Sequence, residues 1–131
     1  MKVLRIKPTR STPELYFDAN RGFIEIQGRC IPDNPCELFY DVEKWIKEYI
    51  QDIPSITHFK FDLEYINTSS LMCLVKVIDR IKTTCKGRTL VKIDWHYEAD
   101  DENSFKTGEE LMAIVGLPVN FLQKTIYAVA C

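Results

Sequence analysis

The sequence lacks any long hydrophobic run and any surplus of one charge, and both absences restrict what the chain can bind. No stretch among its 131 residues approaches the roughly 20 apolar residues that cross a bilayer. The N-terminus carries a charge at every second or third residue and has no signal-peptide core, so we expect a cytoplasmic protein without membrane insertion. Its 17 Lys and Arg against 19 Asp and Glu give a net charge of -2. Nucleic acids and anionic membranes both bind basic surfaces, so neither is expected as the main partner.

A disulfide framework and a metal-binding pattern are also missing. Five cysteines are present, an odd number without a C-x-x-C pair, and their density is far below that of a disulfide scaffold. Reduced thiols in the cytoplasm are the simplest interpretation. A zinc site made of Cys30, Cys36 and the two histidines would have a spacing that fits no structural-zinc pattern, so we expect no metal.

Motifs for catalysis and for cofactor binding are absent as well. The chain has only five glycines and no phosphate-cradling loop, nucleophile elbow, HExxH helix or EF-hand loop. We therefore expect a non-enzymatic protein without a cofactor. A thiol enzyme using Cys30 is the alternative, and it would require a lowered cysteine pKa beside a base.

The composition itself is typical of a folded domain. The residues are 46% apolar and 27% charged, and the length of residues 1–131 is that of one domain with a real core. Residues 1–11 are polar and contain Pro, Ser and Thr, so we expect part of this segment to be a loose N-terminal arm.

After this arm, hydrophobic periodicity alternates between the spacing of strands and the spacing of helices. The predicted strands are 14–18, 22–29, 57–65, 89–97 and a last one near 122–129. The predicted helices are 35–52 with Asn34 as N-cap, 70–85, and a short third helix opened by a capping box at Thr107 and closed by Gly116.

This order of elements predicts an α/β fold with a mixed, mostly parallel sheet and an N-terminal hairpin. Strand–helix–strand units imply parallel pairing through right-handed crossovers. Buried parallel strands usually read as continuous apolar runs, whereas the middle strands here alternate between apolar and polar residues. We therefore expect two layers, with the helices mainly on one face and a wet opposite face that carries His58, Lys60 and Asp94.

Hydroxyl groups are concentrated in the run Asn67-Thr68-Ser69-Ser70, between a predicted strand and the next helix. The simpler interpretation is structural: one of these residues is the N-cap and the others are exposed neighbours. The alternative is a phosphorylation switch, since a phosphate here would meet free backbone N–H groups and the positive end of the helix dipole. It would add a charge of about -1.5 to -2 and change the surface that a partner meets, without breaking the fold.

The carboxyl ends of parallel strands gather at one edge of a sheet, where ligands and partners usually bind. The segments expected there are 28–34 with Arg29 and Asn34, 67–70, and 98–102 with Asp100 and Asp101. Arg29 is the nearest counter-charge for a phosphate. The acidic segment could be a solvated loop, could hold a divalent cation, although it matches no calcium loop, or could dock a basic partner.

Several fragments, taken in order, resemble one known family. They are Thr12-Pro13-Glu14 with Phe17-Asp18, Ile26-x-Gly28-Arg29, Pro32-x-Asn34, Tyr65-x-Asn67-Thr68-Ser69-Ser70, Trp95-x-Tyr97 with the acidic run, Gly108-Glu109-Glu110 and Leu117-Pro118. Each fragment is weak alone, but their order and spacing resemble the SiaC family of regulatory phosphoproteins from about Thr12 to Leu122.

The resemblance implies a fold similar to the STAS domains of anti-sigma factor antagonists, and it implies a mechanism. In this family a protein kinase with a histidine-kinase-like ATP fold phosphorylates the threonine of the Asn-Thr-Ser-Ser segment, and a metal-dependent Ser/Thr phosphatase reverses this. The unphosphorylated form binds and activates a diguanylate cyclase, which raises cyclic di-GMP and favours bacterial aggregation or biofilm. Carried over by position, the phosphoacceptor is Thr68, with Asn67, Ser69 and Ser70 around it.

Two functions from different classes remain open at this point. The first is a phosphorylation switch at Thr68, whose partner-binding surface combines this segment with Arg29, Asn34, Asp100 and Asp101. The second is a STAS-like module that binds a nucleotide or lipid in a crevice between residues 29–34 and 67–70. The second function predicts a concave apolar pocket with convergent polar groups.

Overall fold

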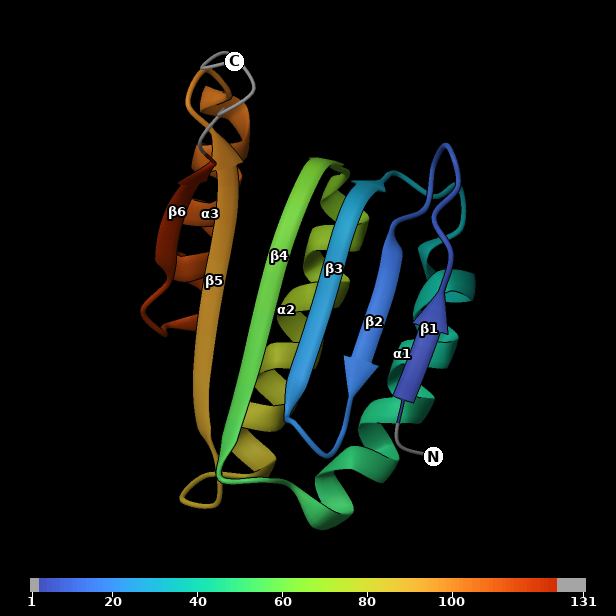
Figure 1. Ribbon diagram of the computed structural model, residues 1–131, viewed down its shortest axis with the longest axis vertical. Coiled ribbons are helices and arrows are strands. Elements are labelled where there is room, and N and C mark those ends of the chain that lie inside the picture. The colour runs from blue at the N-terminus through green and yellow to red at the C-terminus, as the bar shows by residue number, and fades with distance from the viewer. Residues whose placement is uncertain (1–2, 125–131) are drawn as a thin grey trace, which may run out of the picture.

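The computed structural model describes residues 3–124, which form one six-stranded sheet and three α-helices (Figure 1). The strands are β1 (Val3–Ile6), β2 (Glu14–Asp18), β3 (Phe23–Cys30), β4 (Ile56–Ile66), β5 (Leu90–Glu98) and β6 (Asn120–Lys124). The helices are α1 (Pro35–Tyr49), followed by the 3₁₀ turn η1 (Ile50–Asp52), α2 (Thr68–Thr84) and α3 (Glu102–Val115).

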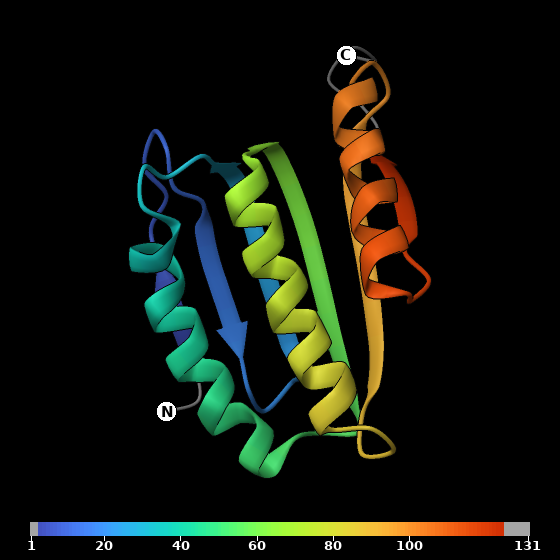
Figure 2. The same cartoon turned by 180° about the vertical axis from the view of Figure 1, so that it is seen from behind.

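The order of the strands in the sheet is their order along the chain. β1, β2 and β3 pair antiparallel, whereas β3 through β6 pair parallel. Each parallel connection passes through one helix, and the three helices lie on the same face of the sheet (Figures 1 and 2). The predicted two-layer α/β fold with a mixed, mostly parallel sheet is therefore confirmed.

The core fills the space between the sheet and the helices. Alternate residues of each strand point toward this layer, and on β4 these are the buried Phe59, Phe61 and Leu63. The predicted apolar stripe of α1 packs on the same face, where Trp45 lies 5.2 Å from Phe17 of β2 and stacks on Tyr49, with ring centroids 4.7 Å apart. Burial of such rings is the main stabilising contribution, because it removes a large apolar area from water.

The opposite face of the sheet is open, as predicted, and the structure shows that its charges are paired. His58 Nε2 lies 2.7 Å from the Asp94 carboxylate, and the Lys60 ammonium lies 3.2 Å from the Glu25 carboxylate. Burial, with a smaller effect from Lys60, lowers the pKa of His96, so this imidazole is neutral at pH 7. His58 pairs with Asp94 and Lys60 with Glu25, so these four side chains have a structural role on the open face.

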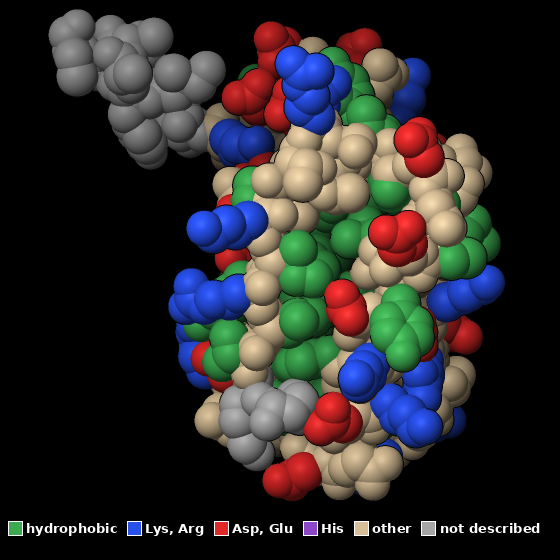
Figure 3. All heavy atoms as spheres, turned by 90° about the vertical axis from the view of Figure 1, so that its right-hand side faces the viewer, with side chains coloured by type: hydrophobic (Ala, Val, Ile, Leu, Met, Phe, Trp, Pro, Cys, Tyr) green, Lys and Arg blue, Asp and Glu red, His purple; other side chains and the backbone are tan. Residues whose placement is uncertain are grey.

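Within the N-terminal segment that was expected to be partly loose, residues 3–6 form the strand β1. This short strand pairs with β2 from Val3 to Ile6, and its Leu4 and Ile6 side chains pack against the core. Figure 3 shows the hollow between β1 and α1, which is lined by hydrophobic side chains. β1 is therefore the edge strand of the sheet, and its Leu4 and Ile6 side chains cover part of the apolar surface that β2 and α1 alone would leave exposed.

The helix boundaries differ from the prediction at α2 and α3. α2 begins at Thr68, two residues before the predicted start, and α3 begins at Glu102 instead of near Thr107. The cause at α3 is Asp101, whose carboxylate accepts a hydrogen bond from the Ser104 amide at 3.0 Å. The predicted end of α3 is confirmed, since Gly116 follows it with a φ of 70°. Of the predicted last strand, β6 contains residues up to 124, and residues 125–129 lie outside the described part.

Gly108 allows α3 to lie close against β5 and β6. A Cβ atom at this position would come within 2.9 Å of Trp95 Cγ and 2.7 Å of Phe121 Cε1. Trp95 is fully buried and donates from Nε1 to Ser104 Oγ at 3.2 Å. The start of α3 is thus fixed to β5 by both packing and a buried hydrogen bond.

Candidate functional site

The hydroxyl-rich junction lies where β4 ends and α2 begins. Asn67 is the N-cap of α2, and its side-chain oxygen accepts a hydrogen bond from the Ser70 amide at 3.0 Å. The alternatives for the capping residue are therefore settled in favour of Asn67. Thr68 is the first residue of the helix, and its side chain is exposed to solvent.

Asn67 also joins this junction to the segment that follows β3. Its backbone amide donates to the Cys30 carbonyl at 3.0 Å, and its side-chain amide donates to the Pro32 carbonyl at 3.3 Å. Segments 28–34 and 67–70 therefore lie together, as expected from the parallel topology. These bonds join the two segments directly across the crevice that the ligand-binding alternative requires, which counts against a nucleotide or lipid site there.

The three hydroxyl residues after Asn67 differ in exposure. Thr68 and Ser69 are exposed, whereas Ser70 is completely buried against the end of β3. Ser70 was expected on the partner-binding surface, and this expectation was wrong for its side chain. The reason is the helical phase set by the cap, which turns the third residue of α2 inward beside Leu71.

The position of Thr68 on α2 follows from helical spacing. Thr68 precedes Lys82 by almost four turns of about 3.6 residues, so the two side chains lie on the same flank of the helix. Lys82 reaches α3, where its ammonium donates to the Val115 carbonyl at 2.7 Å. Thr68 therefore lies on the flank of α2 that faces α3.

Exposed hydrophobic side chains continue along this flank. Met72, one turn after Thr68, is 40% exposed, and Ile114 of α3 is 51% exposed. A hollow of about 100 Å³ lies between the end of β4 and the first turns of α3, and its lining includes Ile66 and Thr107. Thr107 and Ile114 are seven residues apart and share one side of α3. Met72 and Ile114 were not among the residues predicted for this surface, although the four-residue spacing from Thr68 to Met72 was a usable signal.

Arg29 lies on the neighbouring strand and stacks on an exposed aromatic ring. The register of β3 against β4 shifts between Gly28 and Arg29, so that Arg29 pairs with Tyr65. The Arg29 guanidinium lies 5.0 Å from the centre of the Tyr65 ring, and this ring is 57% exposed. Asn34 is also exposed, at the start of α1, and its side chain makes no capping hydrogen bond. Both residues are on the surface where a partner could contact them.

The two acidic residues of the β5–α3 loop have different environments. Asp100 is exposed, whereas Asp101 is half-buried and caps α3 through the Ser104 amide. Among residues 3–124, no three His, Cys, Asp or Glu side chains are grouped closely enough to hold a metal ion. The loop thus presents the negative charge of Asp100 to solvent, whereas the carboxylate of Asp101 is occupied in capping α3.

The start of α2 is electrostatically suited to an anion. The first amides of an α-helix have no acceptor within the helix, and here Asn67 satisfies one of them. The first turn of α2 contains no acidic residue, and Lys82 lies in its last turn. A negative group at Thr68 would therefore meet free donors and the positive end of the helix dipole.

Cys30, the candidate nucleophile of the alternative enzyme, is buried in the structure. Burial raises the pKa of its thiol from 9.0 to about 11, and the adjacent Ser70 hydroxyl opposes this rise without reaching hydrogen-bond geometry. A nucleophilic cysteine needs the opposite shift. The thiol-enzyme alternative is therefore contradicted at this residue. None of the described helices is long and apolar enough to span a bilayer.

Comparisons with known proteins agree with this geometry. The model of the SiaC family regulatory phosphoproteins matches residues 6–124. An uncharacterized protein of Pseudomonas aeruginosa (strain UCBPP-PA14) is 30% identical over 118 residues, which are 90% of this chain and 94% of that protein.

Solved structures give the same result. SiaC of Pseudomonas aeruginosa superposes with a TM-score of 0.82 at 28% identity, over 95% of this chain and 100% of that one. SiaC in a crystal structure with the diguanylate cyclase SiaD, which it activates, gives a TM-score of 0.82 at 29% identity, over 92% of this chain and 99% of that one. From the family match over most of its length, the chain belongs to the SiaC family of regulatory phosphoproteins.

Proposed function

We propose that the chain is a non-enzymatic cytoplasmic signalling protein that binds and activates a diguanylate cyclase while Thr68 is unmodified. Phosphorylation of Thr68 ends this binding and lowers cyclic di-GMP, with consequences for biofilm formation. The observation that carries the proposal is the position of Thr68. It is an exposed hydroxyl at the first residue of α2, beside exposed hydrophobic surface. The SiaC relative that is an activator of the cyclase SiaD supports the choice of partner.

The effect of the phosphate follows from the surroundings of Thr68. A phosphoryl group adds about -1.5 to -2 charge, and the helix start can accept that charge without loss of structure. Docking of a partner over Met72 and Ile114 would require this charge to lose its water, which is costly without a cationic partner. The modification therefore acts on the surface and leaves the fold intact.

Two further proteins belong to this proposal. A kinase with a histidine-kinase-like ATP fold transfers the γ-phosphoryl group of ATP to Thr68 Oγ1, so that the bond to the β-phosphate oxygen breaks, ADP leaves and the hydroxyl proton is released. A metal-dependent Ser/Thr phosphatase hydrolyses the ester with water, which restores the threonine and releases inorganic phosphate. The exposure of Thr68 provides access for both enzymes.

The first experiment asks whether Thr68 is the acceptor. The tagged chain is isolated from its own cells with phosphatases inhibited, and its intact mass is compared with that of a Thr68→Ala variant. We expect a species heavier by about 80 Da, the mass of one phosphoryl group, in the parent protein only. A heavier species that persists in Thr68→Ala would place the modification elsewhere and contradict the proposal.

The second experiment asks which partner reads the switch. Thr68→Ala and Thr68→Asp are used side by side to capture proteins from the same cells, and the captured material is assayed for cyclic di-GMP synthesis. Thr83→Asp, at an exposed threonine in the last turn of α2, is the matched control. We expect cyclase activity on Thr68→Ala and on the control, and little on Thr68→Asp. Equal capture by the two Thr68 variants would overturn the proposal.

A further inference from the structure

The sheet is interrupted between β4 and β5 near the edge that carries Thr68. The two strands pair in register only from Ile56 with Leu90 to Phe61 with Trp95, although β4 continues to Ile66 and β5 to Glu98. Beyond that point β4 pairs only with β3, and β5 only with β6, among the described residues. Figure 1 shows the two strands diverging toward their carboxyl ends. Within residues 3–124, each strand therefore has one edge of backbone groups without a ladder partner.

The divergence leaves a hollow, which we call the notch. It consists of two cavities of about 210 Å³ and 100 Å³ that share Leu63, Glu64 and Ser104 in their linings. Glu98 and Asp101 line the larger cavity from the β5 side. Taken together, the two cavities are near the lower limit of the roughly 300 to 1,000 Å³ of a typical small-molecule site, so the kind of occupant has to be inferred from the strand edges and the charges around the notch.

Contacts on the β5 side hold the notch open. Trp95 donates to Ser104 Oγ, and the Ser104 amide donates to Asp101, so β5 and the start of α3 form one unit. On the open face the Lys124 side chain of β6 bridges the gap, where it pairs with the Asp62 carboxylate of β4. Closing the notch would require these packed elements to shift together.

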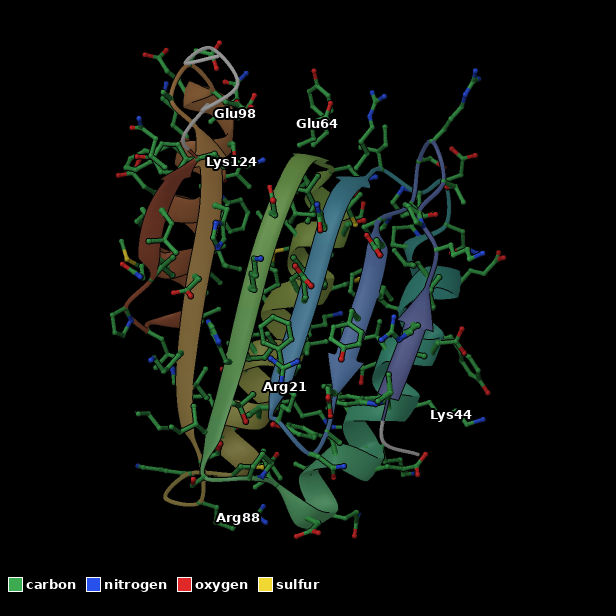
Figure 4. The ribbon with its side chains drawn as sticks, viewed as in Figure 1. Arg21, Lys44, Glu64, Arg88, Glu98 and Lys124 are labelled. Atoms are coloured by element: carbon green, nitrogen blue, oxygen red, sulfur yellow. The ribbon has the colours of Figure 1, made fainter. Side chains whose placement is uncertain are left out.

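The charge of the notch is strongly negative. Four carboxylates line it, those of Asp62, Glu64, Glu98 and Asp101, together with the Lys124 ammonium. Lys124 pairs with Asp62, and Asp101 caps α3, whereas Glu64 and Glu98 are exposed and form no ion pair with a described residue. Figure 4 shows Glu64 and Glu98 at the ends of β4 and β5, on either side of the opening.

We propose that the notch receives an extended, basic segment of a partner protein, whose backbone pairs with the free edge of β4. Two different features select this occupant. Unpaired strand edges are completed by an added strand, which supplies backbone donors and acceptors in register. Uncompensated carboxylates on both sides of the opening attract cationic side chains and repel acidic ones. The inference does not depend on the role of Thr68.

The test uses the full-length chain labelled with ¹⁵N and a seven-residue peptide of alternating lysine and threonine. Amide chemical shifts are followed during the titration. We expect saturable shifts in residues 62–66 and 96–98, together with slower hydrogen exchange of the β4 amides in the complex. A peptide of alternating glutamate and threonine should not bind. A lysine–threonine peptide N-methylated at alternate residues should bind much more weakly, because it lacks backbone donors.

Charge variants test the second feature. The double change Glu64→Gln and Glu98→Gln keeps the shape of two exposed side chains and removes their charges, so we expect an affinity lower by about tenfold. The matched control, Glu109→Gln with Glu110→Gln, changes two exposed carboxylates of α3 that do not line the larger cavity, and it should bind as the parent does. Equal binding of the N-methylated peptide, shifts confined to other residues, or no binding of the lysine–threonine peptide would each overturn the proposal.

Discussion

Two cysteines near the junction of β3 and α1 differ in exposure, and the difference determines their chemistry. Cys30 is buried at the end of β3, whereas Cys36 is exposed in the first turn of α1. Alkylation requires both access and a thiolate. Cys30 is buried, so a reagent cannot reach it. Burial also raises the pKa of its thiol to about 11, so little thiolate is present near neutral pH.

We predict that iodoacetamide at pH 8 modifies Cys36 in the native protein and spares Cys30. Peptide mass mapping after a short exposure measures the two sites separately. The same reaction in concentrated guanidinium chloride is the control, and it should modify both cysteines equally. Preferential modification of Cys30 in the native protein would contradict its described burial and revive a thiol-enzyme function.

At the scale of single residues, the sequence indicates chemical type better than exposure. The cluster around Thr68 could be recognised from its hydroxyl groups, but the burial of Ser70 depends on which residue caps the helix. Tyr65 is a similar case. Strict alternation along β4 would place it inward with Leu63, and the register shift opposite Arg29 places it on the surface instead. Exposure of this kind depends on pairing with another strand, which a single segment does not encode.

Among the elements, α1 and α2 provide a natural comparison, because both begin after an asparagine. The Asn67 side chain accepts from the Ser70 amide and donates to the Pro32 carbonyl, whereas the Asn34 side chain makes no capping bond. An asparagine at the cap position contributes through these bonds, so the two helices should respond differently to its loss.

We predict that Asn67→Ala lowers the free energy of unfolding by about 1 to 2 kcal/mol, because it removes a cap and a link between two loops. Asn34→Ala should cost no more than a few tenths of a kcal/mol, since no side-chain bond is lost. Urea unfolding followed by tryptophan fluorescence measures both. If Asn34→Ala lowered the free energy of unfolding as much as Asn67→Ala does, the loss of a cap would not explain the effect at position 67.

The elements that sequence reasoning placed wrongly are those whose partners are remote. β1 is a short edge strand, and its four residues gain their structure from pairing with β2 and from packing of Leu4 and Ile6. The predicted start of α3 was too late in the chain because Asn103 and Ser104 are residue types common in loops. In the structure Ser104 is buried in the helix and accepts a hydrogen bond from Trp95. By contrast, the long periodic segments of α1, β4 and β5 were predicted correctly, because their patterns are local.

For the molecule as a whole, the proposed switch requires that the modification leave stability unchanged or raise it. Thr68 is at the amino end of α2 and Thr83 is in its last turn, and both side chains are exposed. Negative charge is favourable at the first position and unfavourable at the second, because the helix dipole has opposite signs at its ends.

We predict that Thr68→Glu raises the free energy of unfolding by about 0.3 to 1 kcal/mol and that Thr83→Glu lowers it by a similar amount. Thermal unfolding of the two variants at low ionic strength gives the comparison, and added salt should reduce both effects. If Thr68→Glu unfolded the protein, its loss of partner binding could no longer be assigned to the surface.

The bonds of Asn67 have a consequence for how quickly a kinase could act. In the folded chain Thr68 is part of the first turn of α2. A kinase that binds its substrate in an extended conformation could modify Thr68 only while that turn is unfolded. The hydrogen bonds from Ser70 and to Pro32 both resist fraying. The rate of phosphorylation would then depend on how often this turn unfolds. A variant with a weaker cap would therefore be phosphorylated faster, although its free energy of unfolding is lower.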